Sequence, residues 1–306
     1  MLAGGVGAAR FLRGLRSLLD PRQLTIIVNT GDDETFFGLH VSPDLDTVSY
    51  TLADVVHPHQ GWGLRDESFH TLDALRRYYR DTWFRLGDRD LATHIYRTDA
   101  LRRGHTLSEV TAEIARRLGV RQRILPMSDA PVRTLVTTAG RGRLAFQDYL
   151  VRGRGRGRVC RISFDGAAQA RPAPGVVATL SAADAVILPP SNPLVSIGPI
   201  LALRGVREAL VHARRRTAAI SPIVAGLPIK GPLHRMLTGL GHEVSPVGVA
   251  RLYRGLVSIF VLDRRDAVHA PRIAALGMRP VVTDTVMTTT ARARALARRV
   301  LKELDA

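Results

Sequence analysis

The stretch LTIIVNTGDD, from Leu24 to Asp33, decides the fold class. It opens with a short, largely β-branched apolar run, which is typical of a buried parallel strand. Strands of this kind that alternate with helices predict an α/β fold, a Rossmann-like parallel sheet with helices on both faces. Comparable apolar runs recur along the chain, with amphipathic stretches between them: AVILPPSNP (185–193), TAAISPIVAG (217–226), LVSIFVLD (256–263) and RPVVTD (279–284).

The helix candidates near these strands include GPILALRGVREALVHAR (198–214) and TTTARARALARRVLKEL (288–304). Between about 60 and 125 the pattern is also helical, and TLSEVTAEIARRLG (106–119) has the capping residues, the apolar spacing and the final glycine of one helix. We therefore expect residues 1–306 to form a single Rossmann-like domain, with a helical insertion at about 60–125 that covers the ligand edge of the sheet.

The composition predicts a soluble, cytoplasmic protein. Of the 306 residues 45% are hydrophobic, and the single cysteine, Cys160, fits a reducing compartment. The sequence shows no secretory signal and no apolar run long enough to span a bilayer, so we expect no membrane partner.

The net charge of +17 comes almost entirely from arginine. A basic chain attracts nucleic acid or phosphorylated small molecules. The arginines are spread along the length, however, and aromatic residues make up only 5% of the chain, so we expect no nucleic-acid partner. The densest run, RGRGRGR (152–158), follows a predicted β-hairpin of RTLVTT (133–138) and RLAFQDYLV (143–151) and is interpreted as an exposed loop.

A glycine-rich turn opens the chain. Gly5 and Gly7 precede an amphipathic stretch, and glycine lets a backbone approach a phosphate at a helix N-terminus. Arg10 stands where a dinucleotide-binding fingerprint needs its third glycine, which argues against a standard NAD site. Phosphate binding is the favoured interpretation over a simple tight turn. Only Met1 and Leu2 are available for a strand in front of this turn, so we expect that strand to be short or truncated.

Four aspartates form two short clusters in this basic chain. Asp32 and Asp33 follow the strand of the opening stretch, at the sheet edge where α/β proteins bind ligands. Asp44 and Asp46 precede a predicted helix, and one of them could simply cap it. Carboxylates at these positions favour Mg²⁺ or a substrate hydroxyl over capping alone.

Two proline-rich loops follow successive predicted strands. PPSNPLVSIGPIL (189–201) contains Asn192 and Ser196, and ISPIVAGLPIKGP (220–232) adds Lys230. Proline makes such loops rigid, while amides, hydroxyls and free N–H groups can bind a phosphate or a base edge. Their parallel placement predicts a nucleotide site.

Taken together, these segments resemble the 2-phospho-L-lactate transferase family (CofD and FbiA) of coenzyme F420 biosynthesis, over nearly the whole chain. The segments that carry the resemblance are GGVGAARFLRGL, NTGDD, PDLDTVSYTL, GWGLRDESF, LGDRDLATHIYR, ILPMSDAPVRT, PPSNPLVSIGPIL, SPIVAGLPIKGP and DRRD.

The resemblance implies a reaction. A guanosine-diphosphate-linked donor would carry a 2-phospholactyl or phosphoenolpyruvyl group, the ribityl hydroxyl of the deazaflavin Fo would attack it, and GMP would leave. The product would be F420-0 or dehydro-F420-0. The resemblance also implies Mg²⁺ as the cofactor and a homodimer as the assembly. The sequence leaves the choice between the two donors open.

The same resemblance implies roles for individual residues. Asp32 and Asp33 would hold Mg²⁺, and Asp32 would thereby be catalytic. Asp46 would contact Fo and help to deprotonate its hydroxyl, with Arg85 as a second Fo contact. The nucleotide and diphosphate would be bound by Gly5, Gly7, Asn192, Ser196 and Lys230.

Two other interpretations remain. A non-catalytic regulator that binds a nucleotide or a nucleotide sugar would share the fold without the transfer. An RNA-binding protein would show strongly salt-dependent binding through its arginines. The segments PDLDTVSY and LGDRDLATH favour the transferase over both.

Overall fold

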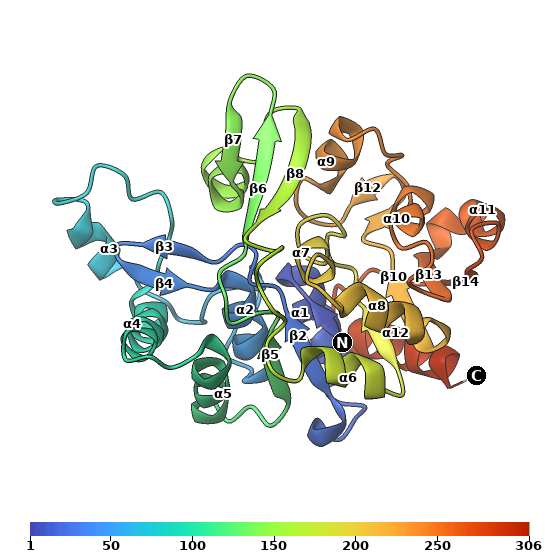
Figure 1. The fold of residues 1–306 in the computed structure, drawn as a ribbon, viewed down its shortest axis with the longest axis horizontal. Coiled ribbons are helices and arrows are strands. Elements are labelled where there is room, and N and C mark those ends of the chain that lie inside the picture. Colours follow the sequence, from blue (N-terminus) through green and yellow to red (C-terminus); the bar gives the residue numbers. More distant parts are fainter. Residues whose placement is uncertain (306) are drawn as a thin grey trace.

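The computed structural model describes residues 1–305, and parallel strands form its centre (Figure 1). Two parallel sheets, β5-β2-β1 and β9-β10-β13-β14, meet where β1 contacts β9. The combined order is that of a Rossmann sheet with one more strand, and it reverses between β1 and β9. The strands are β1 (Leu2–Ala3), β2 (Thr25–Val28), β5 (Arg123–Pro126), β9 (Val186–Leu188), β10 (Thr217–Ile220), β13 (Ile259–Asp263) and β14 (Arg279–Thr283).

The predicted α/β fold is confirmed, and each of the five apolar runs contains a strand. The short strand in front of the glycine turn also exists, because Leu2 pairs with Ile27 and Ala3 with Val28 in parallel register. The strand β5 was missed. It pairs with β2 along four residues although it begins with arginine and ends with proline.

Helices cover both faces of the parallel strands, so neighbouring strand residues belong to different cores. Ile26 and Val28 pack on one side, and Ile27 packs on the other. The first core is closed by α1 (Gly5–Leu15), α2 (Pro43–Leu52), α5 (Leu107–Arg117) and α12 (Thr290–Leu304). The second is closed by α6 (Val176–Ala182), α7 (Gly198–Leu201), α8 (Val206–His212), α9 (Leu233–Gly239), α10 (Pro246–Leu252) and α11 (Ala270–Ala274).

One predicted helix is in fact two. The expected helix at 198–214 is divided into α7 and α8, because Gly205 between them adopts a φ of +84°. Glycine reaches this left-handed conformation readily and often ends a helix. The predicted helix at 106–119 is confirmed as α5, and its Thr106 and Glu109 form a capping box.

The interval 60–125 contains α3 (His70–Leu75), α4 (Asp88–Arg102) and α5, while residues 76–87 are not helical. A β-hairpin that the sequence did not predict, β3 (Glu34–Phe36) with β4 (Leu39–Val41), lies beside them. Figure 1 shows this hairpin with α3 and α4 on the left, away from the C-terminal helices.

A separate antiparallel sheet of β7 (Gly142–Ala145), β6 (Arg133–Thr138) and β8 (Val159–Asp165) stands at the top of Figure 1. The predicted hairpin is confirmed as β6–β7, but its second strand is shorter than expected. The chain turns into a π-helix, Asp148–Arg152, that buries Tyr149.

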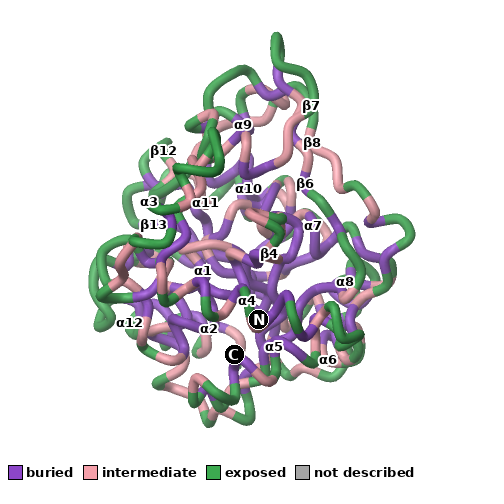
Figure 2. The backbone as a smooth tube through the Cα atoms, turned by 90° about the vertical axis from the view of Figure 1, so that its left-hand side faces the viewer, coloured by how far each residue is buried: buried purple, intermediate pink, exposed green. Residues whose placement is uncertain are grey.

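Burial follows this arrangement (Figure 2). The tube is largely purple through α1 and α2 and green at the outer end of β6 and β7. The four arginines of the 152–158 run are exposed, as predicted. Within residues 1–305, helices that combine the length and the apolarity needed to cross a bilayer are absent.

Candidate active site

A cleft of about 600 Å³ opens beside the point where the strand order reverses. Loops that follow β1 and β9 line it, which is where open α/β sheets bind ligands. Asp33 is the predicted site residue that does not line this cleft. The predicted residues that do line it are Gly5, Gly7, Asp32, Asp46, Arg85, Asn192, Ser196 and Lys230.

The glycine turn packs tightly against the loop after β9. A Cβ at Gly7 would lie 2.1 Å from the carbonyl oxygen of Pro190, so a larger residue cannot fit there. Gly5 has a φ of +67°, and its N–H donates to Asp44 Oδ1 at 2.7 Å. This N–H is therefore already bonded, and the phosphate-binding role of the two glycines stays a prediction.

Asn29, Asp32 and Asp44 form a buried group that we name the Asn29 cluster. The Asn29 amide Nδ2 donates to Asp32 Oδ1 and, at 2.9 Å, to Asp44 Oδ2. Asp44 does not cap its own helix α2, whose N-cap residue is Ser42. It accepts instead from the first turn of α1, so the capping alternative does not explain it.

The two carboxylates of the Asn29 cluster oppose each other's ionisation. Burial raises the pKa of Asp32 well above its usual value, and the charges of Asp44 and Asp33 raise it further. Burial raises the pKa of Asp44 to about 6, against hydrogen bonds from Asn29 and Gly5 that lower it. The cluster therefore favours a proton or a cation.

This arrangement predicts a pH dependence of stability. A carboxyl whose pKa rises from 3.8 to about 6 on folding holds its proton more tightly in the folded state. The free energy of unfolding therefore falls as the pH rises through this range, by of the order of 2–3 kcal/mol for Asp44. Urea unfolding at pH 4.5 and pH 7 should show a smaller fall in Asp44→Asn than in the wild type. Equal falls in the two proteins would contradict the assignment.

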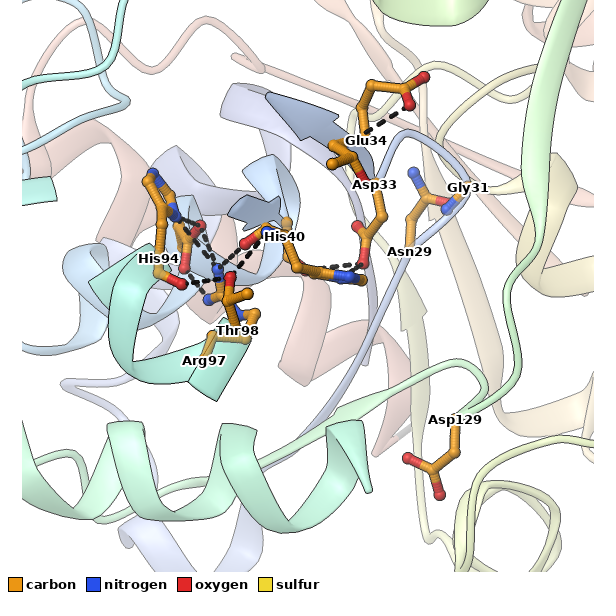
Figure 3. A network of polar contacts seen from close by, with 12 residues as sticks. Asn29, Gly31, Asp33, Glu34, His40, His94, Arg97, Thr98 and Asp129 are labelled. Atoms are coloured by element: carbon orange, nitrogen blue, oxygen red, sulfur yellow. Dashed lines mark hydrogen bonds and ion pairs between the residues drawn. The ribbon is translucent and has the colours of Figure 1, made fainter. Parts of the chain in front are cut away.

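Asp33 lies behind this cluster, held by the β3–β4 hairpin and the residue that follows it. Its Oδ2 accepts from Ser42 Oγ at 2.6 Å and lies 3.1 Å from His40 Nε2. Figure 3 shows His40 between Asp33 on one side and the α4 residues Arg97 and Thr98 on the other. The second oxygen of Asp33, Oδ1, is buried and has no hydrogen-bond partner within residues 1–305.

A second acidic group surrounds Arg97 on α4. Arg97 is 2% exposed and donates to both carboxylate oxygens of Asp46. His94 lies between two carboxylates, with Nδ1 3.7 Å from Asp46 and Nε2 3.4 Å from Asp90. Tyr50 donates its hydroxyl to Asp90 at 2.6 Å. We name these five residues the Arg97 cluster.

The two clusters differ in their counter-charge. Asp46, Asp90 and His94 place three possible metal-ligand atoms within 4.8 Å of one another. The guanidinium of Arg97 already pairs with Asp46, however, and a cation would have to compete with it. Within residues 1–305 the hydrogen-bond partners of Asp32 and Asp44 are an amide and a backbone N–H, which carry no charge. The Asn29 cluster is thus the better place for a hard cation.

Aromatic side chains form one wall of the cleft. Trp83 and Phe84, from the irregular segment before α4, line it together with Trp62. Phe36 of the hairpin stacks on Phe84 at 3.9 Å between ring centroids and meets Trp83 edge-on at 5.4 Å. This aromatic wall offers a flat apolar surface.

The cationic side chains of Arg10 and Lys230 also line the cleft. Burial lowers the pKa of Lys230, and the nearby charge of Arg10 lowers it further. Lys230 Nζ donates to the carbonyl oxygen of Gln60 at 2.9 Å, and so joins two loops. Asn192 uses its Oδ1 within its own loop, where it accepts from Leu194 N–H at 2.9 Å.

Comparisons with known proteins place this cleft in context. The model of the family described as 2-phospho-L-lactate transferase CofD matches residues 1–302. The chain belongs to this family.

Relatives within the family carry two names. A phosphoenolpyruvate transferase from Streptomyces griseus is 43% identical, over 99% of this chain and 96% of the relative. A 2-phospho-L-lactate transferase from Methanosarcina acetivorans is 38% identical, over 100% of this chain and 98% of the relative. Among solved structures, a UPF0052 family protein from Bacillus halodurans has a TM-score of 0.67 at 14% identity, with 98% of this chain and 97% of that chain covered. That likeness extends the CofD fold to a more distant protein.

Within the two clusters, Asn29, Asp90 and His94 were not predicted from the sequence as site residues. Asn29 directly follows strand β2, three residues before Asp32, and a polar residue at the end of a buried strand was the available signal. Asp90 and His94 are four residues apart on α4, so they share one helix face. His94 is 1% exposed and lies between two carboxylates.

Proposed function

We propose that this protein transfers a 2-phospholactyl or phosphoenolpyruvyl group from a guanosine-diphosphate-linked donor to the ribityl hydroxyl of the deazaflavin Fo. The observation that carries the proposal is the mixed lining of a single cleft. The glycine turn, carboxylates and cationic side chains line it together with the aromatic wall. Family membership and the names of the relatives agree with such a transfer.

The donor would lie along the glycine turn and the loop after β9. Lys230 and Arg10 supply positive charge for its phosphates, whereas the other residues that line the cleft are largely acidic or apolar. Asn192 and Ser196 lie on the cleft wall at the reversal of strand order, where they can face the guanosine portion.

Mg²⁺ fits the Asn29 cluster on the chemistry of its side chains. Within residues 1–305, Asp32 is a buried carboxylate that lacks a charged partner, and Oδ1 of Asp33 behind it accepts no hydrogen bond. These two residues would hold the ion, as the resemblance implied. When bound, Mg²⁺ would neutralise the diphosphate and the charge that develops during phosphoryl transfer.

The acceptor would lie between the aromatic wall and the Arg97 cluster. The hydroxyl oxygen of Fo would form a bond to the terminal phosphorus while the bond from that phosphorus to the bridging oxygen breaks, and GMP would leave. Asp46 would take the hydroxyl proton, because its hydrogen bonds with Arg97 hold it in one orientation. Arg85, which lies 4.2 Å over the ring of Phe69, would border the same end.

The test uses the purified protein, Mg²⁺, Fo and each of the two donors, with products resolved by mass spectrometry. Formation of F420-0 or dehydro-F420-0 together with GMP is the expected result, and it also identifies the donor. If the folded protein binds guanosine nucleotide but yields no product from either donor, the function is that of a non-catalytic nucleotide-binding regulator.

The aromatic wall gives a selective prediction. Replacing Trp83 with Leu should raise the KM for Fo about tenfold or more, because stacking on an aromatic ring contributes roughly 1–3 kcal/mol per base-sized ring. Binding of GDP should stay within about twofold of wild type, since Trp83 contacts Phe36 of the β3–β4 hairpin whereas Lys230 contacts Gln60. Equal losses for both ligands would contradict the assignment of the aromatic wall to Fo.

A further inference from the structure

The segment DRRD at the end of β13 contains a buried aspartate with no role in the transfer proposed above. Asp266 lies in the 3₁₀ helix Arg264–His269 and is 3% exposed. Both of its oxygens accept from a single backbone N–H, that of Ala225, at 3.1 and 2.9 Å. A buried carboxylate is unfavourable unless it is hydrogen-bonded, so this contact decides where Asp266 and Ala225 lie relative to each other.

Ala225 stands at the tip of a short hairpin. The strands β11 (Ile223–Val224) and β12 (Leu227–Pro228) pair through two residues each. The two residues between them have positive φ, +50° at Ala225 and +76° at Gly226. Glycine adopts this conformation freely, but alanine does not. The turn therefore needs a stabilising contact at Ala225.

The two strands of this hairpin are held differently, because Ile223 and Val224 of β11 are buried, at 0% and 6% exposure. Leu227 is 64% exposed and Ile229 is 42% exposed, so β12 and the residue after it bury little apolar surface. A two-stranded hairpin of this length is not stable alone. Asp266 fastens its tip, and at its base Ile229 N–H donates to the carbonyl oxygen of Pro222 at 3.3 Å.

The base of the hairpin is part of the cleft. Pro222, Ile229 and Lys230 all line it, and Lys230 reaches across to the carbonyl oxygen of Gln60. We infer that Asp266 is a positioning residue, which fixes the β11–β12 hairpin so that Lys230 stands at the donor end of the cleft. The inference rests on the proposed function in one respect, because it takes Lys230 to be a contact of the guanosine diphosphate portion.

The test measures separately the hydrogen bond between Asp266 and Ala225 and its effect on GDP binding. Asp266→Ala should speed amide hydrogen exchange at Ala225 at least about tenfold, because the bond that protects this N–H is lost. It should also weaken equilibrium binding of GDP about tenfold, the size expected for one charge-assisted interaction. Asp266→Asn keeps one oxygen that can accept from Ala225 and should lie close to wild type. Asp184→Ala, which removes an exposed aspartate, is the matched control and should change neither quantity.

A double-mutant cycle shows whether Asp266 acts through Lys230. Lys230→Met should weaken GDP binding, and adding Asp266→Ala should then weaken it no further, because coupled residues are not additive. Unchanged amide hydrogen exchange at Ala225 in Asp266→Ala would show that Asp266 does not hold Ala225 in place. Faster exchange with unchanged GDP binding, or fully additive losses, would overturn the positioning role. If the wild-type protein does not bind GDP, the proposed function fails and this inference fails with it.

Discussion

Replacing Asp32 with Asn should lower the turnover of the proposed transfer by about 100-fold or more, because it would remove the proposed metal ligand and the charge that would hold Mg²⁺ beside the diphosphate. The same change should leave the fold intact and should raise the melting temperature in the absence of Mg²⁺. Asp32 is buried near Asp44 and Asp33, and their charges oppose its ionisation. A neutral amide removes this repulsion and can still accept from Asn29.

The measurement is turnover as a function of Mg²⁺ concentration, with thermal unfolding in parallel. Asp184→Asn changes the same charge at an exposed position and should affect neither quantity. Turnover of Asp32→Asn within about threefold of wild type would exclude its metal role, since loss of a metal ligand has a far larger effect. A large fall in the melting temperature would show instead that Asp32 supports the fold.

Replacing Arg97 with Met should lower the free energy of unfolding by about 3–5 kcal/mol, because it leaves the buried carboxylate of Asp46 without its counter-charge. Removing both charges together, in Arg97→Met with Asp46→Leu, should recover much of this loss. Urea unfolding measures both effects. The double variant should nevertheless be inactive in the proposed transfer, because Asp46 is then missing.

The same helix offers a matched control. Arg103 and Asp99 form an ion pair at 2.8 Å on α4, with side chains 71% and 52% exposed. Arg103→Met should therefore change the free energy of unfolding by less than about 1 kcal/mol, since exposed pairs contribute little. Similar losses for Arg97→Met and Arg103→Met would show that burial is not what makes the Arg97 pair important.

The sequence predicted the parts of the fold whose residues agree with their environment. The five apolar runs are strands because β-branched residues suit a sheet that is covered on both faces. Strand β5 was missed because Arg123 and Pro126 have no strand preference, and its pairing with β2 decides its conformation. The β3–β4 hairpin was missed for a similar reason, as its turn places Phe37 at a φ of +52°, which phenylalanine rarely adopts.

The site was predicted where residues follow strand ends in the chain, as Asp32 and Asn192 do. The pairing of Arg97 with Asp46 joins residues 51 positions apart, and no local sequence pattern predicts it. The same holds for His94, whose surroundings depend on how α4 packs beside α2. Hydrophobic periodicity shows which face of a helix is buried, but it does not show which charged residue that face contacts.

The loops that make the cleft are joined by a hydrogen bond of 2.7 Å from Ser191 Oγ to the carbonyl oxygen of Gly4. These two residues are 187 positions apart in the chain. During translation the glycine turn therefore leaves the ribosome long before its partner exists. A nascent chain that ends before Ser191 lacks one wall of the cleft, however well its first strands have folded. Loop closure over so long a distance is slow, so the complete cleft should be among the last features that the new protein forms.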